Sequence, residues 1–313
     1  MISPSLDHFL AAYESHSLGR AANRLGLTQP ALSKSIRKLE AELGVPLFER
    51  STTGVVPTSY GETLARRGQA IRADIQSTVV ELHKLRQGEV GEVRMGVAPA
   101  LSPHFLPRVL MWLQERYPSL HMVIHEGLYD GLAQEVSRGE LDFALTNLPS
   151  DAPTFGLQMR EVFRDRFVVC CGPNNPLVAQ SKVHPADLLA WPWVTPPHHG
   201  MAWQRIVDLF AKVGCKPPHA VIQTDSAALI KAMLTNGRFL TFVPRQLVIP
   251  DLARGELIEL ATQEITVERA IAVVSRPGRE QPTAAKLALH ACAAIIDEMS
   301  QEPGWNGYQP KMD

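Results

Sequence analysis

Hydrophobic residues recur at helical spacing in a short run near the start of the chain. They lie three or four positions apart, or side by side, at Leu18, Ala21, Ala22 and Leu25. Ser17 comes directly before this run and is a favourable N-cap residue, while Gly26 can adopt the left-handed conformation that ends a helix. The pattern predicts a short amphipathic helix between Ser17 and Gly26.

A second run of the same kind follows immediately. Its hydrophobic positions are spaced 4, 3 and 4, at Leu32, Ile36, Leu39 and Leu43, and we expect all four to be buried. Thr28 is a second N-cap candidate, Pro30 fits the first turn of a helix, and Gly44 closes the run. Two helices joined by so short a turn predict a helix-turn-helix. An earlier helix would pack behind them through Leu6, Phe9, Leu10 and Tyr13.

The opposite face of the second helix is polar. It carries Gln29, Ser33, Lys34 and Arg37 close to the helix start. Glutamine can bond adenine edges, arginine and lysine guanine edges, and serine bases or phosphates, so this face suits the major groove of DNA. A simple solvated helix face is the alternative interpretation.

Residues 46–61 contain short β-branched segments around a Ser-Thr-Thr-Gly turn, and this pattern predicts a two-stranded wing. Arg50 lies at the base of this wing and could reach a DNA phosphate. An intramolecular ion pair with Glu49 or with an acidic residue of a helix is the alternative.

Residues 58–85 are predicted to form one long helix. Its hydrophobic seam approaches a heptad pattern and comprises Leu64, Ile71, Ile75, Thr78, Leu82 and Leu85, with Gly68 as a weakening residue. The helix could pack on its own domain or form a dimerisation coiled coil. Its position between two domains favours dimerisation, because a linking helix has few other surfaces to pack on.

After a hinge at residues 87–91 the pattern changes to alternating strands and helices. Strands are predicted at residues 93–97, 122–124, 141–145, 167–171, 220–223, 239–243 and 271–275. Helices are predicted at residues 103–117, 131–138, 202–213, 226–235 and 282–299. This alternation predicts an α/β domain with a parallel sheet covered by helices.

Composition narrows the possible classes of protein. The 313 residues, 45% of them hydrophobic, suffice for two or three domains with real cores. No segment approaches a membrane span or a signal peptide, and four irregularly spaced cysteines favour a reducing cytoplasm. Residues 1–87 contain 11 Lys+Arg against 8 Asp+Glu, whereas the remainder contains 20 against 24, so the basic surplus accompanies the helix-turn-helix.

At this point a resemblance becomes specific. The residues that carry it are Ala21-Ala22-x-x-Leu25, Thr28-Gln29-Pro30-Ala31-Leu32-Ser33, Ile36-x-x-Leu39-Glu40, Leu43-Gly44, Leu47-Phe48-x-Arg50 and Thr58-x-x-Gly61. Together they resemble the signature of LysR-type transcriptional regulators, and the resemblance covers nearly the whole chain. It implies operator contacts from Gln29, Pro30, Ser33, Lys34 and Arg37. Thr28, which caps the same helix, and Arg50, at the base of the wing, complete the expected set of DNA-binding residues. Many relatives carry a second basic residue just after the position of Arg50, where this chain has Ser51.

The resemblance also implies an architecture. It comprises a winged helix-turn-helix at residues 1–58, a linker and dimerisation helix at 59–87, and an effector domain at 88–313 similar to periplasmic binding proteins. Lobe one would contain residues 91–162 and 267–300, and lobe two residues 163–266. The family implies homo-oligomers, dimers or tetramers, assembled through linker helices and effector domains, and contact with RNA polymerase if the protein is an activator.

A ligand in such a fold binds beyond the carboxyl ends of the strands and between the lobes. The residues expected there are Pro99, Ala100, Leu101, Ser102, Leu128, Tyr129, Thr146, Asn147, Thr195, His198, His199 and Phe242. Ser102 could instead only cap the next helix, Asn147 could shape a turn, and the two histidines could be surface residues. The free N–H groups of a helix start near Ser102 would attract a carboxylate. Leu101, Tyr129 and Phe242 could hold an apolar body, so an aromatic or small organic acid is the expected effector.

The sequence gives little support for a metal site or for a redox-active cysteine. Adjacent histidines point apart and no third ligand has a familiar spacing, so we expect no metal and no cofactor. Cys170 and Cys171 should pack on opposite faces of a strand. In the peroxide-sensing branch of the family the reactive cysteine lies in the loop that reads His198-His199-Gly200-Met201 here, and a redox role for nearby Cys215 is disfavoured.

The predicted function is a cytoplasmic, sequence-specific regulator that binds double-stranded operator DNA and responds to a small molecule, without enzymatic activity and without a membrane. A constitutive DNA-binding regulator with no physiological ligand is one alternative. A solute-binding protein or an enzyme is the other, but the chain shows no phosphate-binding glycine loop and no nucleophile elbow.

Overall fold

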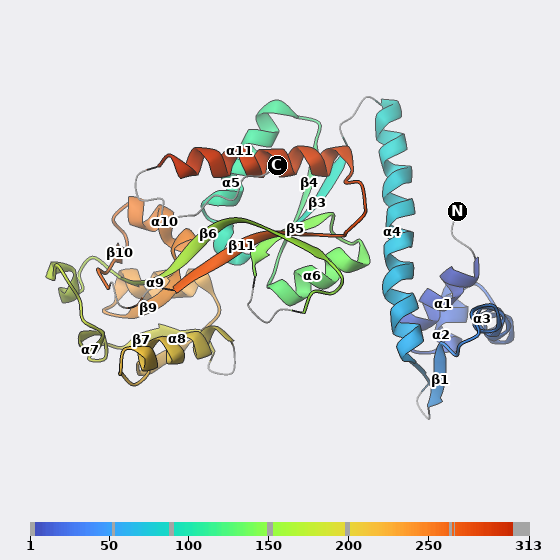
Figure 1. The fold of residues 1–313 in the computed structure, drawn as a ribbon, viewed down its shortest axis with the longest axis horizontal. Helices are drawn as coiled ribbons and strands as arrows, with labels where there is room; N and C mark the ends of the chain where they lie inside the picture. Colours follow the sequence, from blue (N-terminus) through green and yellow to red (C-terminus); the bar gives the residue numbers. More distant parts are fainter. Residues whose placement is uncertain are drawn as a thin grey trace.

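The computed structural model describes residues 4–51, 54–87, 91–148, 153–197, 201–262, 265 and 267–302. A long helix, α4 (Ser59–Gln87), stands between a small helical domain and a larger α/β domain (Figure 1). The helix α3 lies on the side of α4 that faces away from the α/β domain.

Three helices build the small domain, α1 (Pro4–Ser15), α2 (Leu18–Leu25) and α3 (Gln29–Leu43). The predicted caps are confirmed. The hydroxyl groups of Ser17 and Thr28 accept hydrogen bonds from backbone N–H groups in the first turns of α2 and α3, and Gly26 and Gly44 end these helices in the left-handed conformation. Side-chain oxygens thus satisfy donors that a helix start leaves free.

The buried stripe of α3 is shorter than predicted. Leu32 and Ile36 are buried against α1 and α2, and Leu39 packs partly buried on the second cluster of this domain. Leu43 is 48% exposed, so its predicted burial is wrong. Leu43 belongs to neither hydrophobic cluster of this domain, and a hydrophobic spacing alone cannot show which positions the neighbouring elements cover.

The predicted wing is confirmed in its two strands, β1 (Phe48–Ser51) and β2 (Gly54–Pro57), which pair antiparallel. Thr52 and Thr53 of the turn lie outside the described residues. A side chain at Gly54 would meet the carbonyl oxygen of His16 at 2.4 Å, which explains why a glycine follows the turn.

The linker helix α4 is joined firmly to the small domain. The Thr58 hydroxyl accepts a hydrogen bond from the N–H of Gly61, and a Cβ at Gly61 would meet the Leu47 carbonyl oxygen at 2.2 Å. Gly68 likewise lets Leu6 of α1 approach closely. Glu14 pairs with both Arg24 of α2 and Arg72 of α4. These contacts make α4 a continuation of the small helical domain.

The α/β domain contains one nine-stranded sheet with the order β4-β3-β5-β11-β6-β9-β7-β8, and β10 pairs with β6. Its strands are β3 (Glu92–Val97), β4 (His121–Glu126), β5 (Phe143–Asn147), β6 (Gln158–Cys171), β7 (Trp193–Thr195), β8 (Ala220–Gln223), β9 (Leu240–Pro244), β10 (Ile258–Glu259) and β11 (Val267–Ser275). The expectation of a parallel sheet is wrong in part, because β6 and β11 run antiparallel to each other and to their outer neighbours β9 and β5.

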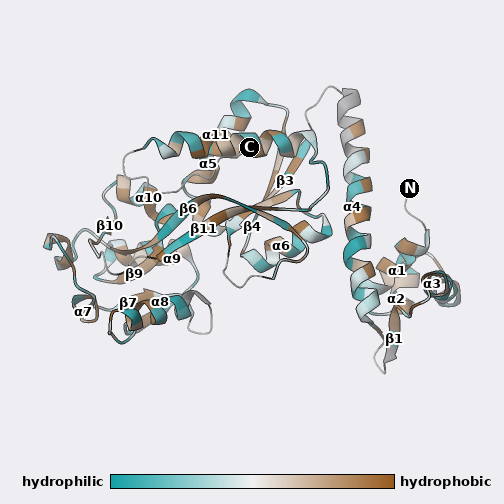
Figure 2. Ribbon diagram, in the orientation of Figure 1, coloured by the Kyte–Doolittle hydropathy of each residue, from teal (hydrophilic) through white to brown (hydrophobic). Residues whose placement is uncertain are grey.

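Helices cover both faces of this sheet. They are α5 (Phe105–Arg116), α6 (Tyr129–Arg138), α7 (Pro185–Leu188), α8 (Met201–Lys212), α9 (Ala227–Asn236), α10 (Arg245–Ala253) and α11 (Thr283–Ser300), with 3-10 turns η1 (Pro99–Leu101) and η2 (Pro176–Ala179). Hydrophobic residues concentrate on the sheet and on the inner sides of these helices (Figure 2). The predicted lobe boundary at Val162 falls inside β6, which runs continuously through both lobes together with β11.

Cys170 and Cys171 lie on opposite faces of β6, as predicted. Cys171 belongs to the cluster with Trp193 and Phe210, and Cys170 belongs to the cluster under α9 and α10. Burial raises the pKa of the Cys171 thiol to about 11, so this thiol stays protonated near neutral pH.

Candidate DNA-reading face and effector site

The outer face of α3 presents the predicted DNA-reading residues. Gln29, Pro30, Lys34 and Arg37 are exposed, and Ser33 is half-buried. Arg37 Nε donates a hydrogen bond to the Ser33 carbonyl oxygen at 3.3 Å, which holds the arginine stem along the helix. The Thr28 hydroxyl accepts the N–H of Ala31 at 3.4 Å, so Thr28 has a capping role at the same helix start.

Glu40 sets the position of the wing relative to α3. Its Oε1 atom accepts hydrogen bonds from the backbone N–H of Leu47 at 2.8 Å and of Phe48 at 3.3 Å. Arg50 pairs with Val55 in the wing, and its side chain lies outside the described part of the structure. Glu40 follows Leu39 in the family signature, and this position was the signal in the sequence for a role that was not predicted.

The elements predicted for lobe one meet those predicted for lobe two at the end of β3. Ala100 of η1 is buried in the cluster of lobe two that contains Val168 and Leu247. His104 Nδ1 lies 3.2 Å from Oε1 of Gln246 on α10. Burial lowers the pKa of His104, and the positive charge of Arg108 lowers it further, although the bond to Gln246 opposes this shift. The predicted segment 99–102 therefore lies at the junction of the lobes.

Ser102 does not cap the next helix. Helix α5 begins at Phe105 after His104, and Ser102 ends η1 instead. Its hydroxyl donates a hydrogen bond to Oε2 of Glu126 at 2.5 Å. The carboxylate of Glu126 would repel an acid placed on this hydroxyl. The helix start near Ser102 is thus less suited to an anionic effector than the sequence indicated.

Three residues expected to hold an apolar ligand are part of the protein core. Leu101 is fully buried among residues of β3, α5 and α11. Tyr129 is the first residue of α6 and is buried, and its hydroxyl donates to the carbonyl oxygen of Pro153 at 2.8 Å. Phe242 is buried and stacks on Phe167 with ring centroids 5.1 Å apart. All three side chains are packed against other residues of the core, so each is a weak candidate for a ligand contact.

Thr146 and Thr195 behave differently. Each is fully buried, near the carboxyl end of β5 in lobe one and of β7 in lobe two respectively. The hydroxyl oxygen of each has no hydrogen-bond partner among the described residues. Leaving such a group unpaired costs about 1–3 kcal/mol. Asn147 is half-buried beside Thr146, and Leu128 is exposed before α6. His198 and His199 lie outside the described residues.

No group of three His, Cys, Asp or Glu side chains within the described ranges could hold a metal ion. In the same ranges no helix is long and hydrophobic enough to span a bilayer.

Comparison with known families decides the identity. Residues 5–62 match the bacterial regulatory helix-turn-helix family of LysR proteins, and residues 86–295 match the LysR substrate-binding domain. The chain belongs to the LysR family of transcriptional regulators. It is a DNA-binding regulator with a ligand-binding domain, as the sequence predicted, and the predicted fold class is confirmed as a helix-turn-helix domain followed by that domain.

Individual LysR proteins resemble this chain over most of its length. The transcriptional regulator GbpR of Azospirillum brasilense is 31% identical over 243 residues, which are 77% of this chain and 71% of GbpR. The structure of ArgP from Mycobacterium tuberculosis has a TM-score of 0.68 at 17% identity, covering 95% of this chain and 97% of ArgP. CbnR in complex with its target DNA has a TM-score of 0.61 at 18% identity, covering 94% and 100%.

One arginine near the predicted effector loop was not among the residues expected to bind the effector. Arg205 lies one turn into α8, directly after the predicted effector loop, and is half-buried. No described acidic side chain pairs with it. Burial lowers the pKa of Arg205, and the positive charge of Arg269 lowers it further. An unpaired, partly desolvated guanidinium is a favourable partner for a carboxylate.

Proposed function

We propose that this LysR regulator reads its operator with the exposed face of α3 and responds to a small organic acid bound between the lobes. The base-reading residues are Gln29, Ser33, Lys34 and Arg37, with Thr28 and Pro30 at the helix start and Arg50 on a phosphate. The exposure of Gln29, Pro30, Lys34 and Arg37 from the start to the middle of α3 supports this role. The relative CbnR binds its target DNA, and the same mode is proposed for this chain.

The observation that carries the effector site is the pair of unpartnered, buried hydroxyl groups of Thr146 and Thr195, one in each lobe. A ligand that forms hydrogen bonds with both hydroxyl groups would favour the arrangement of the lobes in which it can reach both. Arg205 supplies the positive charge for an acid. The proposed neighbours of this site are Pro99, Ala100, Leu128, Asn147, His198 and His199. Ser102 is a weaker candidate because its hydroxyl bonds Glu126, and Phe242 is a weaker candidate because its ring stacks on Phe167.

The regulator is proposed to act as a homo-oligomer in the cytoplasm, without catalytic activity of its own. Exposed hydrophobic residues on α4 support pairing of linker helices. Contact with RNA polymerase is proposed if the protein activates transcription. A constitutive regulator that no metabolite alters is the competing function.

A thermal-shift screen of the full-length protein against aromatic acids, aliphatic acids, amino acids and the corresponding neutral amides tests the effector site. A ligand of the native state must raise the melting temperature. We expect acids to act, amides to fail, and the shift to disappear in Arg205→Gln and Thr146→Val. Lys212→Gln, which changes an exposed residue of the same helix, should keep the shift. Equal shifts in all variants would refute this site, and a silent screen would favour the constitutive regulator.

A further inference from the structure

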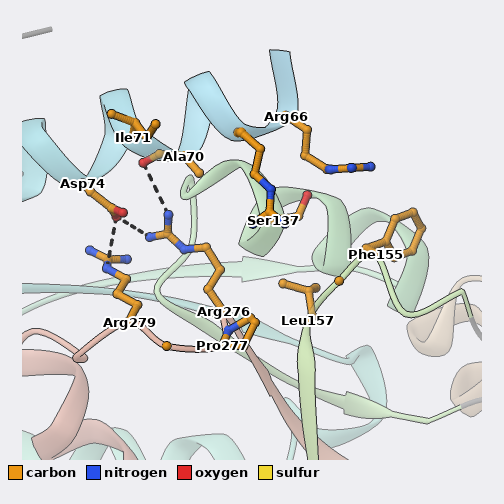
Figure 3. Close-up of a pocket in the computed structure, with 13 residues that line it drawn as sticks. Arg66, Ala70, Ile71, Asp74, Ser137, Phe155, Leu157, Arg276, Pro277 and Arg279 are labelled. Atoms are coloured by element: carbon orange, nitrogen blue, oxygen red, sulfur yellow. Dashed lines mark hydrogen bonds and ion pairs between the residues drawn. The ribbon is translucent and has the colours of Figure 1, made fainter. Parts of the chain in front are cut away.

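A separate cavity lies between the linker helix and lobe one, away from the effector site proposed above. Its volume is about 560 Å³, within the usual range for small-molecule sites. Helix α4 forms one wall, and the opposite wall comes from the segments before β6 and after β11 (Figure 3). The residues at its surface include four arginines, Arg66, Arg67, Arg276 and Arg279.

Two of these arginines, Arg276 and Arg279, form ion pairs that connect lobe one to α4. Arg276 Nη2 lies 2.6 Å from Oδ1 of Asp74, and Arg279 Nε lies 3.0 Å from the same oxygen. Arg276 also donates to the Ala70 carbonyl oxygen at 3.4 Å, and Arg279 to the Ser77 hydroxyl at 3.1 Å. Figure 3 shows both guanidinium groups reaching from lobe one to α4. Asp74 is the one carboxylate among the residues lining the cavity.

The positive charge of the cavity exceeds what Asp74 can neutralise. Arg66 and Arg67 are exposed on α4 and form no ion pair with any described residue. The side chain of Arg276 is 10% exposed, yet its Nε donor has no hydrogen-bond partner among the described residues. Asp142 reaches Arg279 only at 3.9 Å. Two free guanidinium groups and one buried, unpaired donor thus meet at one cavity.

We propose that this cavity binds a small organic dianion, a phosphate monoester or a dicarboxylate, between α4 and lobe one. Guanidinium groups bind both kinds of anion in bidentate geometry. Phe155, Leu157 and Pro277 provide an apolar wall for the carbon body of the ligand.

The dianion would strengthen the attachment of α4 to lobe one, because it bonds Arg66 or Arg67 on one side and Arg276 on the other. Since α4 continues into the DNA-binding domain, the ligand would favour one placement of α3 relative to the effector domain. This second site would act on DNA binding without passing through the cleft between the lobes.

Isothermal titration of the full-length protein at constant ionic strength tests the proposal, with glucose 6-phosphate, inorganic phosphate and succinate as probes and acetate as the monoanion control. We expect saturable binding of at least one dianion and none of acetate. The double variant R66Q/R67Q should bind on the order of 10-fold more weakly or worse, because it loses charged hydrogen bonds. K212Q/K216Q, which removes two exposed charges from lobe two, should bind as the wild type does.

Hydrogen exchange locates the site independently of the variants. The dianion should slow amide exchange in residues 66–79 of α4 and in residues 276–279. Binding that only Arg205→Gln weakens would place the anion between the lobes, overturning this proposal while supporting the effector site. Equal weakening in both double variants, or no saturable binding of any dianion, would also overturn it. Preference among the three probes distinguishes phosphate from dicarboxylate.

Discussion

Arg269 donates two hydrogen bonds to Oδ2 of Asp165, at 3.0 and 2.7 Å, between the two strands that run through both lobes. Both side chains are buried, and the Arg269 guanidinium also lies over the ring of Phe167, 5.4 Å from its centroid. A buried ion pair therefore joins β6 to β11 close to the predicted boundaries between the lobes.

Arg269→Ala should lower the free energy of unfolding by about 3–5 kcal/mol, because it leaves the Asp165 carboxylate buried without a partner. Urea denaturation followed by circular dichroism measures this change. Arg164→Ala is the control, since Arg164 forms its ion pairs with Glu161 and Glu268 at the surface and should matter little. Equal effects of the two substitutions would contradict the structural role of the buried pair.

Glu40→Ala should lower the free energy of unfolding by about 1–3 kcal/mol, because two backbone donors of the wing lose their acceptor. DNA affinity should also fall for all sequences alike, since the wing positions the protein on phosphates. Thermal denaturation and fluorescence anisotropy with labelled duplexes give the two quantities. Glu42→Ala, at an exposed position of the same helix, should leave both nearly unchanged.

Protonation of His104 should lower the free energy of unfolding as the pH falls. Its pKa is lowered in the folded protein from the usual 6.5, so below that pH the unfolded chain binds a proton that the native state resists. The stabilising effect is complete above about pH 6.5 and is lost as the pH falls below it. Urea midpoints between pH 5 and 8 should therefore drop less steeply for His104→Asn than for the wild type. Identical slopes would show that His104 is not responsible.

Leu82→Glu should weaken the homo-oligomer, because Leu82 is 62% exposed in the single chain and lies on the predicted seam of α4. Size-exclusion chromatography with light scattering should show a smaller species at micromolar concentration. Gln76→Glu places the same charge at another exposed position of α4 and should not change the mass. Unchanged assembly in Leu82→Glu would exclude this part of the linker as an interface.

The helices of the small domain could be predicted from the sequence, because their ends are marked by capping residues. Ser17, Thr28, Gly26 and Gly44 act within a few residues of themselves, so their capping roles could be predicted. The exposure of Leu43 could not be predicted, because it depends on which residues distant in the sequence cover the end of α3.

The α/β domain was predicted less completely, since strand direction is decided by distant partners. Charged residues such as Arg160 and Arg164 interrupt the first half of β6, and the pattern therefore indicated a strand only from Phe167. Arg276 and Asp74 are separated by 202 positions, so no local sequence pattern could predict their ion pair. The orphaned hydroxyls of Thr146 and Thr195 became informative only once their surroundings were known.

Selection of duplexes from a random-sequence pool tests most directly whether the exposed face of α3 reads bases. The wild-type regulator should enrich one related set of sequences, with two half-sites if it binds as a dimer. Arg37→Ala should lose about 1–3 kcal/mol of binding to the selected sequence while keeping its affinity for unselected DNA. Failure to enrich any sequence, or an equal loss in Arg37→Ala for all DNA, would contradict base reading by this face.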